Sequence, residues 1–187
     1  MKKWKILESQ TILKNQWFDI KEHKVQITDT LAIEGVVVLE FPDWVNIIAL
    51  DDKNQVVLEK NYRHGRGDFC IETPSGSLEP TDKSPVEAAR RELLEETGYA
   101  ADQLIQLGIS TTNPQLLTNQ MHHFLALGVK WVQPPQHEFE GAVESWVEPW
   151  SKVMARIDNG EISNSLAVEG LLRAERYLRA KKPKDFK

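Results

Sequence analysis

The chain has 187 residues, 41% hydrophobic and 27% charged, which is typical of a soluble globular protein large enough to bury a core. The formal net charge of −5 argues against a broad nucleic-acid surface, because phosphate binding needs clustered Lys and Arg. The single cysteine, Cys70, excludes an internal disulfide and a multi-cysteine zinc site, and is expected as a buried structural thiol. No segment approaches the roughly 20 apolar residues of a membrane span, and no apolar run follows the N-terminal MKKWK. A cytoplasmic protein without membrane contact is therefore expected.

The first part of the chain is expected to form β-strands. Short mixed runs before position 40 favour strands at 17–20, 25–27 and 36–39. A β-hairpin is expected next, because apolar runs at 45–50 and 56–58 flank the turn-forming residues 51–54. Further strands are expected at 69–73, 121–131 and 142–147.

Helices complete the expected fold. One strong helix is predicted over 85–97, and the region from Pro149 on predicts a C-terminal amphipathic helix. The apolar residues of that second helix are Leu166, Val168, Leu171, Leu172 and Tyr177. Strands interleaved with helices, without a regular strand–helix–strand rhythm, favour a mixed α/β sandwich over a doubly wound sheet.

The sequence indicates where the 85–97 helix begins and where it ends. Ser84 is the expected N-cap, Pro85 suits the first helical position, and Glu87 completes a capping box. Gly98 is expected to end the helix, because glycine easily takes the left-handed conformation of a C-cap. The core-facing residues expected from helical spacing are Val86, Ala89, Leu93 and Thr97.

The same helix carries Glu92, Glu95 and Glu96 on one face. Like charges at this spacing cost roughly 0.2–0.5 kcal/mol per pair. One interpretation is a solvated acidic face, with Arg91 paired to Glu87 and Glu95. Two features favour a divalent cation instead. The glutamates lie in the C-terminal half, where the helix dipole disfavours negative charge, and a preceding strand and Gly-containing loop can bring backbone carbonyls near them.

Residues 76–99 resemble the Nudix box, which is a Gly, five residues, a Glu, seven residues and then Arg-Glu-apolar-x-Glu-Glu-x-Gly-apolar. The second half, Arg91 to Tyr99, matches position by position. The first half departs, because counting back from Arg91 puts the family Gly on Ser77 and the family Glu on Lys83. One residue is therefore inserted in the loop, and the adjacent Asp82 is the candidate replacement for the missing Glu.

More of the chain resembles the ADP-ribose and nucleoside-diphosphate-sugar branch of the Nudix enzymes. The resemblance lies in Asn61-Tyr62-Arg63 after a strand and in Glu72-Thr73-Pro74-Ser75-Gly76 before the box. It implies an α/β Nudix fold, an α/β/α sandwich with a mixed β-sheet and an N-terminal β extension. The implied domains are an extension at 1–40, for dimerisation and substrate cover, and a Nudix hydrolase domain at 41–187.

The resemblance also implies a metal centre and a base. Glu92, Glu95 and Glu96 would bind Mg²⁺, with Mn²⁺ as the alternative ion, helped by the backbone carbonyl of Ser75. Arg91 would hold the glutamates through charge-assisted hydrogen bonds. The base that activates water would come from an acidic loop after the box, with Glu140 as first choice and Glu138 as second. A solvated acidic loop is the alternative interpretation of those two residues.

Substrate contacts follow from the same branch. Arg63 suits a diphosphate or a terminal ribose, and Glu72 suits a sugar hydroxyl or a base edge. Trp17 and Trp44 are candidates for stacking on a nucleobase, although core packing is the commoner role of tryptophan.

The implied reaction is Mg²⁺-dependent hydrolysis of a nucleoside diphosphate sugar such as ADP-ribose, giving a nucleoside monophosphate and a sugar phosphate. A homodimer is also implied. The alternatives are another Nudix pyrophosphatase, acting on nucleoside triphosphates or capped RNA, and an inactive ADP-ribose-binding Nudix module. The retained glutamates argue against the inactive module.

Overall fold

The computed structural model describes residues 2–136 and 143–181. The chain separates into two compact units. The first unit comprises residues 1–43 and 110–120, and the second comprises 44–109 and 121–187. Within the described ranges, no helix is long and apolar enough to cross a membrane.

The first unit contains an antiparallel sheet of β1 (Lys5–Lys14), β2 (Asp19–Gln26) and β3 (Ala32–Glu40). A bridge between Leu39 and Leu117 ties the 110–120 segment to β3. Every residue of β1 is exposed. The sequence did not predict β1, because its apolar residues come in adjacent pairs instead of alternating with polar ones.

The second unit is built on a mixed sheet with the strand order β12-β5-β4-β10-β9. Strand β10 runs parallel to β4, while β5 runs antiparallel to both β4 and β12. Two short strands extend it, since β6 pairs with β5 and β7 pairs with β4. The bounds are β4 (Trp44–Leu50), β5 (Gln55–Arg63), β6 (Asp68–Glu72), β7 (Ser75–Ser77), β9 (Leu104–Thr111), β10 (Gln120–Leu127) and β12 (Val143–Pro149).

The expected hairpin is confirmed as β4 and β5. Its turn is stabilised by Asp51, whose Oδ1 accepts hydrogen bonds from the backbone N–H groups of Lys53 and Gln55 at 2.8 Å each. The single strand expected at 121–131 is wrong, because the chain turns at Gly128, where φ is 65°. Beyond the turn, β11 (Lys130–Trp131) pairs with β8 (Tyr99–Ala100).

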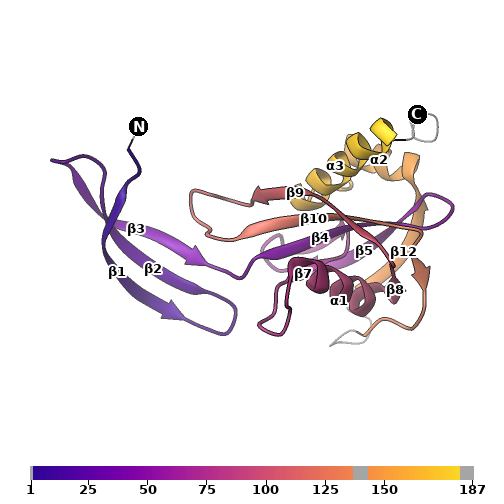
Figure 1. The fold of residues 1–187 in the computed structure, drawn as a ribbon, viewed down its shortest axis with the longest axis horizontal. Helices are drawn as coiled ribbons and strands as arrows, with labels where there is room; N and C mark the ends of the chain where they lie inside the picture. Colours follow the sequence, from indigo (N-terminus) through magenta and orange to yellow (C-terminus); the bar gives the residue numbers. More distant parts are fainter. Residues whose placement is uncertain (1, 137–142, 182–187) are drawn as a thin grey trace. The chain divides into compact units, whose positions relative to one another are not determined.

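Helices cover both faces of the sheet of the second unit (Figure 1). On one face, Val45, Ile47 and Ala49 of β4 pack with α1 (Pro85–Thr97). On the other face, Ile48 and Leu50 pack with α2 (Trp150–Asp158) and α3 (Ser165–Lys181). These layers confirm the expected α/β/α sandwich with a mixed sheet.

Two helical details differ from expectation. The C-terminal region forms α2 and α3 instead of one helix, and between them Gly160 has a φ of 81°. Leu172 is 42% exposed. The buried positions of α3 include three small residues, Ala167, Gly170 and Ala174. Their small side chains let the helix approach the sheet closely.

The ends of α1 are as predicted, from Pro85 to Thr97. Ser84 Oγ accepts from the Glu87 N–H at 3.3 Å, and Gly98 has a φ of 73°. The return arm of the capping box differs, because the Glu87 carboxylate accepts from the backbone N–H of Lys83. Val86 was wrongly expected in the core. It is 38% exposed, and the buried stripe begins at Ala88.

Candidate active site

Arg91 on α1 is the centre of a charged network. Its Nη1 donates to Glu92 Oε1 at 2.9 Å and to Glu95 Oε2 at 3.1 Å. Its Nη2 donates to Asp82 Oδ2 at 2.9 Å and to the Ser77 carbonyl at 3.0 Å. Burial alone would lower the pKa of Arg91, but its acidic neighbours raise that pKa above its ordinary value. Arg91 therefore stays charged and holds two of the three predicted metal-binding glutamates.

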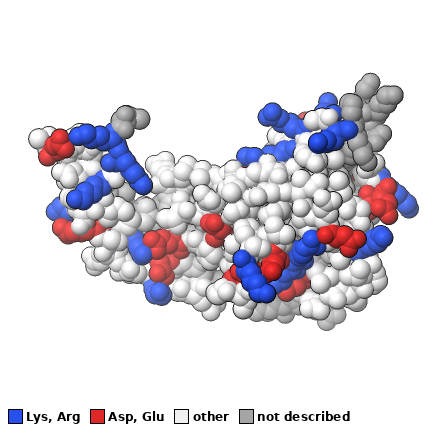
Figure 2. Space-filling view, viewed as in Figure 1, with Lys and Arg blue, Asp and Glu red and all other residues white. Residues whose placement is uncertain are grey.

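Asp82 anchors the lengthened loop before α1. It accepts from both Nε and Nη2 of Arg91, and its Oδ2 also accepts from the backbone N–H of Glu79 at 2.8 Å. The hydrogen bonds from Arg91 hold the pKa of Asp82 below its ordinary value. On the face shown in Figure 2, acidic and basic side chains are interspersed.

Glu92 lies directly against the backbone of β7. A Cβ placed on Gly76 would come within 2.1 Å of the Glu92 carboxyl group. Glycine is therefore needed at position 76 for this approach. Burial raises the pKa of Glu92, and Arg91 opposes the shift.

Glu96 has a different set of neighbours. Its Oε2 accepts from the backbone N–H of Ser75 at 2.9 Å, so Ser75 meets this glutamate through its N–H, and the predicted role of its carbonyl stays a prediction. Glu59 on β5 lies within hydrogen-bonding reach of Glu96. Burial raises the pKa of Glu59 to about 7, and burial together with the charge of Glu59 raises the pKa of Glu96. Sequence reasoning missed Glu59, which follows an apolar strand run and carries no motif.

The donor set fits a hard divalent cation. Among the described residues, no three acidic, His or Cys side chains form a ready-made metal-binding group. Arg91 instead donates hydrogen bonds to Glu92 and Glu95, and the backbone N–H of Ser75 donates one to Glu96. Their carboxylate oxygens are nevertheless the ligands that Mg²⁺ and Mn²⁺ prefer. Glu59 Oε1 is buried and finds no hydrogen-bond partner in the described chain, so the site retains unused acceptor capacity.

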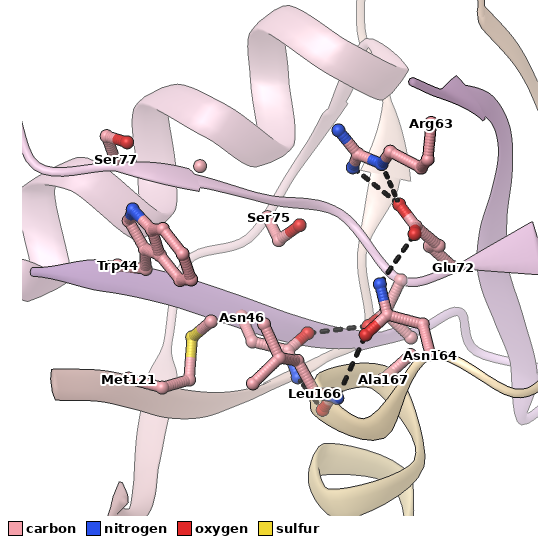
Figure 3. Close-up of a pocket in the computed structure, with 12 residues that line it drawn as sticks. Trp44, Asn46, Arg63, Glu72, Ser75, Ser77, Met121, Asn164, Leu166 and Ala167 are labelled. Carbon is pink, nitrogen blue, oxygen red and sulfur yellow. Dashed lines mark hydrogen bonds and ion pairs between the residues drawn. The ribbon is translucent and has the colours of Figure 1, made fainter. Parts of the chain in front are cut away.

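A pocket of about 340 Å³ adjoins β7. Figure 3 shows a chain of three polar side chains at one end of it. Arg63 Nε donates to Glu72 Oε2 at 2.9 Å, and Asn164 Nδ2 donates to Glu72 Oε1 at 2.5 Å. The side chain of Glu72 is 2% exposed and that of Arg63 is 47% exposed. Glu72 is thus held from both sides, while Arg63 remains accessible to a ligand.

The other end of the pocket carries Trp44 and Met121 (Figure 3). Asn46 lies between the two ends. Its Oδ1 accepts from Thr73 Oγ1 at 2.5 Å, and its Nδ2 donates to the Leu166 carbonyl at 2.7 Å. The pocket is therefore lined by residues of the sheet and by the start of α3.

Sequence reasoning missed Asn46 and Asn164. An Asn inside the apolar run of β4 was a signal that could have marked the first, because a buried amide needs hydrogen-bond partners. Nothing in the sequence around Asn164 distinguishes it from an ordinary loop residue.

The predicted site residues fall into three groups. Arg63, Glu72, Ser75 and Trp44 line the same pocket, next to the glutamates of α1. Trp17 lies in the first unit and is 66% exposed, so its stacking role stays a prediction. Glu138 and Glu140 lie outside the described residues.

Comparison with known proteins decides the family. Residues 41–164 match the model of the NUDIX domain. The chain belongs to the Nudix family. Among the relatives of this Nudix hydrolase, the ADP-ribose pyrophosphatase of Mycobacterium tuberculosis is 30% identical over 168 residues, which cover 89% of this chain and 80% of the relative. The ADP-ribose pyrophosphatase of Bacillus subtilis is 32% identical over 126 residues, covering 65% and 68%.

The fold of this Nudix hydrolase is also found among solved structures. The crystal structure of an ADP compounds hydrolase superimposes with a TM-score of 0.83 over 97% of both chains, at 19% identity. The expected Nudix fold and the resemblance drawn from residues 76–99 are thereby confirmed.

Proposed function

We propose that this Nudix hydrolase cleaves the diphosphate bond of a nucleoside diphosphate sugar, with ADP-ribose as the default test substrate. The products are a nucleoside monophosphate and a sugar phosphate. The observation that carries the proposal is the placement of the Arg63–Glu72–Asn164 chain and Trp44 in one pocket, adjoining the glutamates of α1 through β7. The names of the two pyrophosphatases with similar sequences support the same substrate class.

Glu92, Glu95 and Glu96, with the Ser75 carbonyl, are the residues that would hold Mg²⁺. A bound divalent cation neutralises charge on the phosphate oxygens and lowers the barrier to attack by water. Arg91 keeps Glu92 and Glu95 oriented through its hydrogen bonds at 2.9 and 3.1 Å. Glu140, with Glu138 as second choice, is proposed to accept the proton of the attacking water.

The pocket supplies the substrate contacts. The exposed guanidinium of Arg63 can bind the diphosphate or a ribose hydroxyl. Glu72 can accept from a sugar hydroxyl, since Asn164 and Arg63 already hold its carboxylate in place. Trp44 offers a flat apolar surface for a nucleobase at the opposite end.

A substrate panel with Mg²⁺ tests the proposal. It should contain ADP-ribose, GDP-mannose, UDP-glucose, dinucleoside polyphosphates, deoxynucleoside triphosphates and capped RNA. We expect the highest kcat/KM on a nucleoside diphosphate sugar and no turnover after removal of divalent cations. A preference for a triphosphate or capped RNA would overturn the substrate class. Tight ADP-ribose binding without turnover would instead favour the binding module.

We also propose a homodimer in which residues 1–40 cover the partner's site. The first unit supports it with apolar side chains left exposed on β1 and β3, namely Ile6, Leu7, Ile12, Leu13 and Val37. Light scattering should give the mass of a dimer, and activity should fall when the protein is diluted below the dissociation constant. A monomer that is fully active at nanomolar concentration would refute the dimer.

A further inference from the structure

Strand β5 contributes a buried carboxylate that the proposed mechanism does not use. Glu59 is 1% exposed and lies directly opposite Glu72, which is 2% exposed, in the antiparallel register of β5 and β6. Residues opposite one another in such a register project from the same face of a sheet. The Glu59 carboxyl also reaches that of Glu96 on α1. Glu59 therefore lies close to two other carboxylates, those of Glu72 on β6 and Glu96 on α1.

The hydrogen bonds of this cluster do not balance its negative charge. Among the described residues, Arg63 is the cation that lies near these carboxylates. Its guanidinium already donates to Glu72. Neutral groups serve the other two: Ser75 N–H donates to Glu96 at 2.9 Å, and Asn61 Nδ2 donates to Glu59 Oε2 at a long 3.4 Å.

The remaining oxygen, Glu59 Oε1, finds no hydrogen-bond partner within residues 2–136 and 143–181. Two carboxylates cannot donate to each other unless one carries a proton. Burying an ionised carboxylate without a partner is expensive, so such a group either takes a proton or binds a cation. The position of Glu59 against Glu96, a proposed metal-binding residue, favours the cation.

We propose that Glu59 is a further residue of the divalent cation site, acting together with Glu96. This inference rests on the proposed function, since it deepens the same site. It assigns the cation site to two elements of the fold, strand β5 and helix α1, instead of the helix alone. The alternative is a buried carboxyl pair that shares a proton and makes no contribution to metal binding.

The test measures Mn²⁺ binding without substrate, by the loss of the free-ion signal in electron paramagnetic resonance. The variants are Glu59→Gln, which keeps the size and removes the charge, and Glu59→Leu, which fits a buried strand position. The matched control is Glu148→Gln, because Glu148 is also a buried glutamate of the sheet but is paired with Arg156. Melting temperatures with and without Mn²⁺ provide the second measurement.

We expect both Glu59 variants to weaken Mn²⁺ binding by about 10- to 100-fold, the usual effect of removing a group that supports a metal site. Without metal, Glu59→Gln should melt at a higher temperature than the wild type, because a buried like-charge contact is lost, yet gain less from added Mn²⁺. Glu148→Gln should bind Mn²⁺ as the wild type does. Wild-type Mn²⁺ affinity in folded Glu59→Gln and Glu59→Leu would overturn the inference while leaving the proposed function standing. A wild-type protein that neither binds Mn²⁺ nor hydrolyses any panel substrate would overturn both.

Discussion

On α1, the guanidinium of Arg91 is shared among Asp82, Glu92 and Glu95, whereas in the pocket Arg63 is matched to the single carboxylate of Glu72. We call Glu92, Glu95 and Glu96 the acid face. The acid face carries a surplus of negative charge, while the pocket end pairs one cation with one anion and adds a neutral amide. We therefore propose that a cation binds at the acid face and that a largely uncharged sugar binds in the pocket. The two regions should fail differently when altered.

The largest effect is expected at the acid face. Glu96→Gln should abolish Mg²⁺-dependent turnover, lowering kcat by about 10³-fold, because the ion is expected to supply several kcal/mol of stabilisation and each 1.36 kcal/mol is tenfold. The fold should remain, since the substitution keeps the size of the side chain. Steady-state kinetics and circular dichroism check this. Glu87→Gln, an exposed glutamate on the same helix, is the control. Hydrolysis by Glu96→Gln at the wild-type rate would show that Glu96 binds no catalytic metal.

A smaller effect, mainly on KM, is expected at the pocket. Arg63→Ala should raise KM for the nucleoside diphosphate sugar by about 10- to 100-fold, because a hydrogen bond to a charged group contributes about 1.5–3 kcal/mol. Arg63→Lys should recover part of the loss, since it keeps the charge but not the planar fork. If kcat falls instead and KM stays constant, Arg63 acts in the chemical step and the contrast between the two regions is lost.

Asn164 should give a weaker version of the same result. Asn164→Ala removes the donor to Glu72 Oε1, and we expect a rise in KM of about fivefold, corresponding to about 1 kcal/mol. Asn164→Asp should be worse, because it places a second carboxylate against Glu72. Ser163→Ala, at the adjacent position, is the control. Equal KM values for all three variants would remove Asn164 from the site.

The smallest effect concerns stability and a buried histidine that lies next to Asn46, a residue of the pocket. His123 is fully buried beside Asn46, with Nδ1 at 3.3 Å from Asn46 Nδ2, and burial lowers its pKa. A lowered folded-state pKa means that the unfolded chain binds the proton more readily. Stability should therefore be constant with respect to this group above pH 6.5 and decline as the pH falls below 6.5 toward the folded-state pKa. Urea unfolding at several pH values should show a shallower decline for His123→Gln, and identical slopes would contradict the prediction.

The fold was predicted best where local chemistry decides it. Helix α1 begins and ends where Ser84, Pro85 and Gly98 indicate, because caps act within one turn. Strand β1 and the turn at Gly128 were not predicted, because the spacing of apolar residues along the sequence does not change clearly at either place. His122 and His123 are both buried although adjacent residues of a strand point to opposite faces, because helices cover both faces of the sheet.

By itself, the sequence determined the acid face, because glutamates three and four residues apart must converge on any helix. It also determined the family of the chain, because the pattern from Arg91 to Tyr99 is specific. It also identified Arg63 and Glu72. Only the tertiary structure decided that these two pair with each other, that Asn164 completes their chain, and that Glu59 reaches Glu96. The contacts of Asn164 and of Glu59 join elements far apart in the chain, and the burial that makes these charges consequential exists only once the sheet and helices have packed.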